Sequence, residues 1–195
     1  MAVSPDGRYV ATGGSSDNWV KIFEVASGRE VRSIDTGAGA TFAMGYTGDG
    51  RFLVGSHGDG SLRAWGAAEG TAARTLSTGA GYVPVCGFSR DGRILAYPND
   101  EGAILVVEAG GWSQVRRLEG HEGGTSYVAF HPRGRHLAST GHNGQVKIFD
   151  VGSGKMVRLV DEGVGTGSRL TFTADGQALV VAGTDGTVRI FGRKR

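Results

Sequence analysis

The strongest constraint on the fold is a repeat of 42 residues that runs through the chain. A turn marker followed by glycine recurs at this spacing, with one extra residue after its first copy, at Asp6, Asp49, Asp91, Arg133 and Asp175. Two further classes of position keep the same register: Asp17, Asp59, Glu101, Asn143 and Asp185, and Phe23, Trp65, Val107, Phe149 and Phe191. Periods of about 40 to 45 residues with several strands per unit are typical of β-propeller blades.

The fourth repeat shows the expected blade most clearly. Alternating or apolar runs predict strands at residues 127–130, 135–140, 145–151 and 155–160. Short turns rich in glycine and proline separate these runs, and Asn143-Gly144 predicts a two-residue hairpin whose residues both adopt positive φ angles. Four antiparallel strands joined by short turns make one blade.

The repeats together predict an all-β chain, a β-propeller of four-stranded antiparallel blades forming a single region over residues 1–195. The expected blades are residues 1–41, 42–84, 85–126, 127–168 and 169–195. Because the last blade stops after its third strand, at Phe191, about nineteen strands are expected. Three arrangements stay open: a tight five-blade ring, an open arc completed by another chain, and a segment of a larger propeller. Unpaired strand edges favour the arc or the segment.

Composition narrows the environment in which this chain works. The 36 glycines are spread through the turns, and the net charge of +2 gives little general attraction for nucleic acid or a membrane surface. The only cysteine, Cys86, sits in an apolar run, which favours a core role and a reducing compartment. No signal peptide or membrane-spanning stretch is evident. We therefore expect an intracellular protein, most simply cytoplasmic, with no membrane partner.

Two stretches carry a family resemblance. SPDGRYVATGG followed by WVKIFEV in the first repeat, and HPRGRHLASTGHNGQVKIFDV in the fourth, resemble the core pattern of the WD-repeat (tryptophan-aspartate repeat) family of β-propellers. The resemblance covers the whole chain. It implies blades arranged in a ring around a central channel, and a role as a platform for other proteins.

The chain departs from the family pattern in two ways. No repeat keeps the terminal Trp-Asp pair, and the Gly-His pair survives only at Gly120-His121. The buried hydrogen-bond chain of the family is therefore approximated only in the fourth blade, by His121, Ser139, Asn143 and Phe149, and phenylalanine donates no hydrogen bond. We expect the blades to be held mainly by packing of the first-strand hydrophobes Val3, Tyr46, Phe88, Phe130 and Phe172.

Catalytic and cofactor chemistry is not indicated by any motif. Several possible metal ligands fall on loops of one expected face: His57, Asp59, Asp100, Glu101, His121, Glu122 and His142. None of them has the spacing of a known metal motif. The glycine-rich stretches 36–39 and 78–81 lack the lysine and helix of a phosphate-binding loop, and read as connectors between blades. We expect no enzyme, no metal and no cofactor.

Binding of other protein chains is the function that is left. Short, rigid loops of one face carry aromatic and charged groups, and we expect Tyr82, Asp100, His121 and His142 to contact a partner. The prediction is a non-catalytic interaction scaffold that presents this face and its open blade edges, with a second copy of the chain among the possible partners. The alternative is a structural subunit embedded in a multiprotein or ribonucleoprotein complex. In that case the basic residues Arg193, Lys194 and Arg195 would contact nucleic acid or an acidic partner. Arginines on the fourth strands are expected to protect outer edges.

Overall fold

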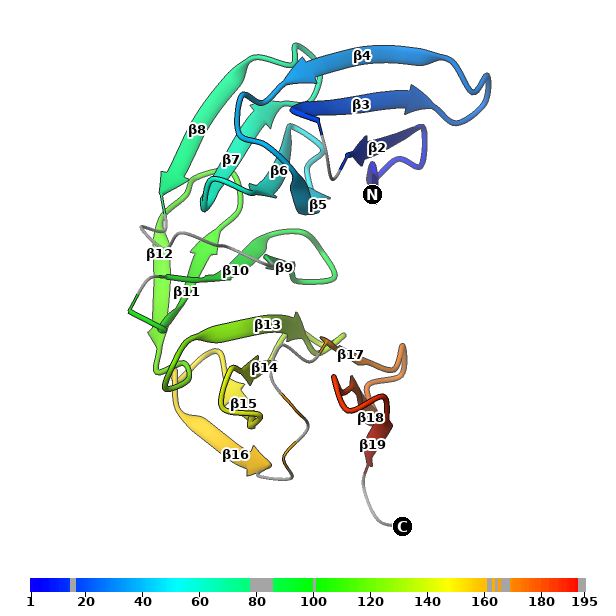
Figure 1. The fold of residues 1–195 in the computed structure, drawn as a ribbon. Helices are drawn as coiled ribbons and strands as arrows, with labels where there is room; N and C mark the ends of the chain where they lie inside the picture. Colours follow the sequence, from blue (N-terminus) through cyan, green and yellow to red (C-terminus); the bar gives the residue numbers. More distant parts are fainter. Residues whose placement is uncertain are drawn as a thin grey trace. The chain divides into compact units, whose positions relative to one another are not determined.

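Each repeat folds into one antiparallel sheet whose strands follow the order of the chain (Figure 1). The computed structural model describes residues 1–14, 17–77, 86–99, 101–160, 163, 165 and 169–192. The first sheet holds β1 (Ala2–Val3), β2 (Tyr9–Gly13), β3 (Trp19–Glu24) and β4 (Glu30–Asp35). The second holds β5 (Thr41–Tyr46), β6 (Phe52–His57), β7 (Ser61–Gly66) and β8 (Ala72–Ser77).

The remaining sheets repeat this order. The third holds β9 (Gly87–Phe88), β10 (Ile94–Pro98), β11 (Ile104–Glu108) and β12 (Gln114–Leu118). The fourth holds β13 (Thr125–Phe130), β14 (His136–Gly141), β15 (Val146–Asp150) and β16 (Met156–Val160). The fifth has three strands, β17 (Arg169–Phe172), β18 (Ala178–Ala182) and β19 (Val188–Gly192). The all-β fold, the antiparallel blades and the unfinished last blade are therefore confirmed.

The chain divides into two compact units. One comprises Met1–Cys86 with Ala109–Gly111, and contains the first two sheets. The other comprises Gly87–Glu108 with Trp112–Arg195, and contains the last three. No helix long and apolar enough to span a membrane is found among the residues that the structure describes.

The turn between the first two strands of a blade is held by a recurring serine or threonine. In the first blade the Ser4 hydroxyl donates to Asp6 at 2.6 Å and accepts from the Tyr9 amide at 2.9 Å, while Gly7 takes a φ of 71°. Such side-chain bonds to the local backbone stabilise a turn without further secondary structure. The same bonds are made at Thr47, Ser89 and Thr173. In the fourth blade, His131 takes this position.

The hairpin at Asn143-Gly144 differs from the prediction. Gly144 has a φ of 75°, but Asn143 is not among the residues with positive φ. The Gly144 amide donates to the Gly141 carbonyl at 3.1 Å, and the Asn143 side chain accepts from the Gln145 amide at 3.2 Å. Asparagine thus acts through its side-chain oxygen, and only the glycine needs the left-handed conformation.

Apolar side chains from neighbouring sheets form the core of each unit. In the first unit, Val20 and Ile22 of the first sheet pack in one cluster with Leu53 and Trp65 of the second. In the second unit, Phe149 lies in a cluster that joins the third and fourth sheets. Phe149 is 1% exposed, and burying such a side chain stabilises a fold by roughly 1.5 to 3 kcal/mol.

The expected first-strand hydrophobes do not all contribute equally. Tyr46 and Phe130 are buried, and Phe88 and Phe172 are half-buried. Val3 was expected in the same role, but its side chain is 58% exposed. The expectation is wrong for Val3, which does not belong to the cluster shared with the second sheet, whereas its neighbour Ala2 packs against that cluster and Ile22 and Ile34 form part of it. Cys86 is buried and unpaired, as expected for a core residue.

Candidate functional site

The outer edge of the fifth sheet exposes two large apolar side chains. β19 pairs on one side with β18, and no strand pairs with its other side among the residues described. Val188 is 66% exposed and Ile190 is 70% exposed. Between them, Arg189 is held by an ion pair to Asp185 at 2.8 Å, so its side chain runs back along the preceding turn. An apolar strand edge with free backbone groups is a template for pairing.

The same two positions are covered in the other blades. The residues that occupy the position of Val188 are all 0% exposed: Val20, Leu62, Ile104 and Val146. At the position of Ile190, Ile22, Ala64 and Val106 are 3%, 0% and 0% exposed, and Ile148 is half-buried. Since the repeats share one register, the exposure of β19 goes with the lack of a strand beside it among the described residues, and not with a different sequence pattern in the strand.

The four complete blades show what a fourth strand looks like in this chain. Opposite the position of Val188, the fourth strand carries a buried aliphatic residue, in the pairs Val20–Ile34, Leu62–Leu76, Ile104–Leu118 and Val146–Val160. Opposite the position of Ile190, the fourth strand carries arginine, in the pairs Ile22–Arg32, Ala64–Arg74, Val106–Arg116 and Ile148–Arg158. A bulge follows at the same place in all four pairs. The edge of β19 therefore fits a strand with the pattern arginine, any residue, aliphatic.

Two of these arginines do more than protect an edge. Arg32 donates to the Glu69 carbonyl at 2.8 Å, and Arg116 donates to the Gly152 carbonyl at 3.0 Å. Both acceptors lie in the last turn of the next blade. The fourth-strand arginine thus ties one blade to its successor, a role that the sequence pattern did not reveal.

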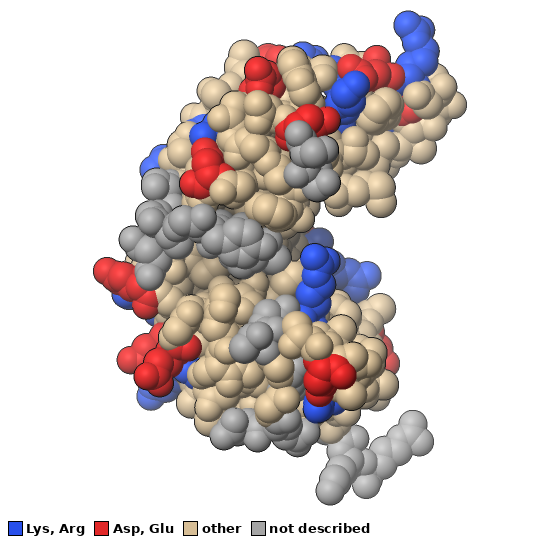
Figure 2. All heavy atoms as spheres, in the orientation of Figure 1, with Lys and Arg blue, Asp and Glu red and all other residues tan. Residues whose placement is uncertain are grey.

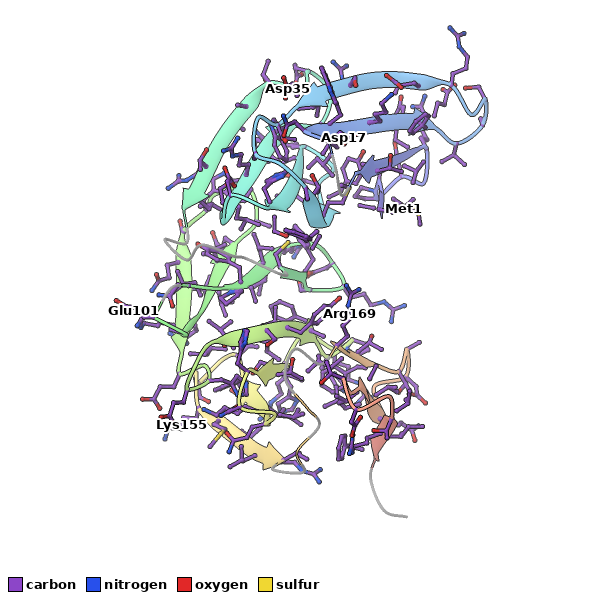
Figure 3. The ribbon with its side chains drawn as sticks, viewed as in Figure 1. Met1, Asp17, Asp35, Glu101, Lys155 and Arg169 are labelled. Carbon is purple, nitrogen blue, oxygen red and sulfur yellow. The ribbon has the colours of Figure 1, made fainter. Side chains whose placement is uncertain are left out.

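The predicted contact face is described only in part. Tyr82 and Asp100 lie outside the described residues, as do Arg193, Lys194 and Arg195. His142 is exposed in the β14–β15 turn, where its amide donates to the Gly124 carbonyl at 3.0 Å. The matching turn of the first sheet carries Asp17, which is labelled in Figure 3. On the face shown in Figure 2, acidic and basic groups are interspersed.

His121 differs from the expectation of an exposed contact. Its ring is 4% exposed, and Nε2 lies 2.7 Å from the Ser139 hydroxyl, which confirms the expected His–Ser pair. Burial, together with the nearby Lys147 charge, lowers the pKa of His121 to about 4. A Cβ on Gly141 would lie 2.4 Å from the ring, so the ring fits only because this position is glycine. His121 therefore lies in the interior of the blade.

His57 was placed on an exposed loop by the sequence, but it ends β6 with 0% exposure. Its Nδ1 lies 3.2 Å from the Thr41 hydroxyl, and its ring meets Trp65 edge to face at 5.2 Å. Burial, with the Arg63 charge, lowers the pKa of His57 to about 4. No group of three or more metal-ligating side chains occurs among the described residues.

A reciprocal exchange of residues explains His57. In the repeat register, His57 stands where the fourth blade has Gly141, and Gly37 stands where it has His121. Each of these two repeats thus has one histidine and one glycine at this pair of positions, and the two residues have changed places between the repeats. The second blade has Gly55 in place of Ser139, and the Nε2 atom of His57 is left without a partner among the described residues. The paired His–Gly exchange was the signal that sequence analysis could have used.

Four-stranded antiparallel sheets that repeat along the chain define a protein of propeller blades. The family model for the WD domain, G-beta repeat, matches residues 1–24, 112–150 and 164–192. The chain therefore contains a WD40-repeat domain. Such domains commonly serve as scaffolds for protein interactions and are typically non-catalytic. A search of the curated proteins returned no match.

Proposed function

We propose that this chain is a non-catalytic protein-interaction scaffold that binds an extended strand of another, intracellular protein along β19. The observation that carries the proposal is the exposure of Val188 and Ile190, at 66% and 70%, where the four complete blades bury every counterpart except Ile148, which is half-buried. Addition of a strand to a sheet edge satisfies the free backbone groups and gives specificity through alternate side chains. We propose His142 as an accessory contact at the turn face.

The other blades specify the chemistry of the partner strand. It should run antiparallel to β19, with an aliphatic side chain opposite Val188 and an arginine opposite Ile190, because all four complete blades make these pairs. A strand of this pattern would bury the two exposed residues and place its arginine at the outer edge.

A peptide with the sequence of residues 153–162, which spans β16, tests the proposal directly. We expect the fluorescently labelled peptide to bind the full chain, as measured by anisotropy. A peptide with proline in place of both Val157 and Arg158 should not bind, because proline donates no backbone hydrogen bond. Equal binding of the two peptides would contradict strand addition.

Substitutions in the chain locate the binding edge. Val188→Asp with Ile190→Asp should weaken peptide binding about tenfold or more, since two apolar contacts are replaced by charges. Both side chains are mostly exposed, so the fold should persist. Val31→Asp is the matched control, because Val31 is 47% exposed on the outer strand of a complete blade. If that control weakened binding as strongly, the peptide would be adhering to apolar surface in general.

A further inference from the structure

A cavity of about 430 Å³ lies between the first and second sheets, which belong to one compact unit. Ser4 and Tyr9 line it from the first sheet, and Tyr46 and Gly50 line it from the second. This volume falls within the range of small-ligand sites. The cavity lies at the end of the blades where the turns between first and second strands are found, away from the β19 edge in the sequence and in a different unit.

The equivalent place between the fourth and fifth sheets is filled by a side chain. His131 stands at the repeat position of the serine, and its ring meets Phe172 edge to face at 5.0 Å and His136 at 6.0 Å. Its Nδ1 accepts from the Arg133 amide at 3.1 Å, which leaves the proton on Nε2. Nε2 then donates to the Gly176 carbonyl at 3.0 Å. A planar N–H donor thus joins these two sheets.

The interface between the first and second sheets has similar surroundings but no imidazole ring. Tyr9 and Tyr46 stand at the positions of the two aromatic partners, and Gly50 stands at the position of Gly176. A Cβ on Gly176 would lie 2.4 Å from the imidazole, whereas a Cβ on Gly50 would meet nothing closer than Pro5, at 3.8 Å. The cavity therefore contains the space that an imidazole ring occupies in the other interface.

The lining groups favour a cation. Asp6 and Asp49 line the cavity, and hydrogen bonds from Ser4 and Thr47 lower the pKa of each carboxyl group. Arg32 also lines it, so the three ionised groups sum to one negative charge. The Tyr46 side chain is 8% exposed, and its hydroxyl has no hydrogen-bond partner among the described residues. Burial raises the pKa of Tyr46 to about 12, so the hydroxyl stays neutral and its oxygen can accept.

We propose that this cavity binds the guanidinium group of an arginine side chain presented by a partner protein. The group is planar like the imidazole of the filled interface, and it stacks on aromatic rings. Its five N–H donors match the acceptors at this cavity: the Gly50 carbonyl, the Tyr46 hydroxyl oxygen and a rim carboxylate. A neutral imidazole would satisfy fewer of these acceptors and leave the negative charge unpaired. The proposal does not depend on strand binding at β19.

Titration of the full chain with N-acetyl-arginine N-methylamide tests the proposal. With ¹³C-labelled tyrosine, we expect saturable NMR shifts at Tyr9 and Tyr46. The matching citrulline compound is planar but uncharged, and the lysine compound is charged but not planar, so each should bind about tenfold or more weakly. A histidine compound tests the imidazole alternative. Equal binding of citrulline, stronger binding of histidine, or no shift at these two tyrosines would overturn the proposal.

Variants of the chain place the binding in this cavity. Ser4→His should fill the space with the chain's own ring, as His131 does, and abolish the tyrosine shifts. Asp49→Asn keeps the turn acceptor but removes the charge, and should weaken arginine binding about tenfold. Asp91→Asn changes the same kind of turn in the third sheet and should have no effect. If Ser4→His does not fold, Asp49→Asn and Asp91→Asn still test the site. Equal affinities of these two variants for the arginine compound would refute binding in this cavity.

Discussion

Two buried histidines determine how this chain responds to acid. His57 is 0% exposed and His121 is 4% exposed, and burial lowers the pKa of each ring to about 4. In the unfolded chain, each ring has the ordinary pKa of about 6.5. Between these two values the unfolded state binds more protons than the folded state. Stability is therefore complete above pH 6.5 and is lost as the pH falls toward 4.

We predict that the free energy of unfolding in urea falls between pH 7 and pH 4.5 by about 2 kcal/mol for each of these histidines. Carboxylates with lowered pKa values, such as Asp49, act in a lower window, because their unfolded pKa is near 3.8. A flat profile between pH 6.5 and 4.5 would show that the rings are not buried as neutral groups. The ¹³C shifts of the two imidazoles, followed in the folded chain, would measure the pKa values directly.

Sequence analysis found the His121–Ser139 pair but not the surroundings of His57. The pair follows the spacing of a familiar motif, so residue type and register were enough. His57 replaces a motif residue from another position, and its ring packs closely against Gly55, where a Cβ would lie 3.2 Å from Nε2. Where glycine replaces the motif histidine, no motif can be recognised in that repeat. The exchange is visible only when the repeats are compared position by position.

At the scale of elements, strand order followed from the 42-residue register, because alternation and turn residues act locally. The contacts between blades did not follow from it. Arg32 and Arg116 lie on outer strands, where charge ordinarily protects an edge, yet their guanidinium groups reach carbonyl groups of the next blade. Those contacts depend on how two sheets pack, which the period of a single strand does not encode.

Removing either arginine should loosen the junction between two blades. We predict that Arg32→Ala and Arg116→Ala each lower the free energy of unfolding by roughly 0.5 to 1 kcal/mol, since each loses a charge-assisted but solvent-accessible hydrogen bond. Arg93→Ala is the control: its side chain is 85% exposed, and it should change stability by less than about 0.5 kcal/mol. Equal effects in urea unfolding for all three variants would mean that the carbonyl contacts contribute nothing specific.

At the scale of the whole molecule, one rule applies to the ends of the repeat array. The first four sheets bury Val20, Leu62, Ile104 and Val146 completely, whereas β19 exposes the equivalent Val188. Each repeat therefore carries an apolar face that only a neighbour can cover, as in other repeat proteins. The last repeat has the same face and no cover among the described residues. The sequence could predict the unfinished blade, but the degree of exposure came from the structure.

This uncovered edge should make the isolated chain associate with itself when no partner is present. We predict that light scattering with multi-angle detection gives a mass that rises above 20.2 kDa as the concentration increases, because unpaired apolar edges pair with one another. Val188→Asp with Ile190→Asp should hold the mass at that of one chain, since it places charges along the edge. Val31→Asp, on a complete blade, should leave the association unchanged. A chain that stays monomeric at every concentration, with and without the β19 substitutions, would show that this edge is not adhesive and would remove the main support for strand addition.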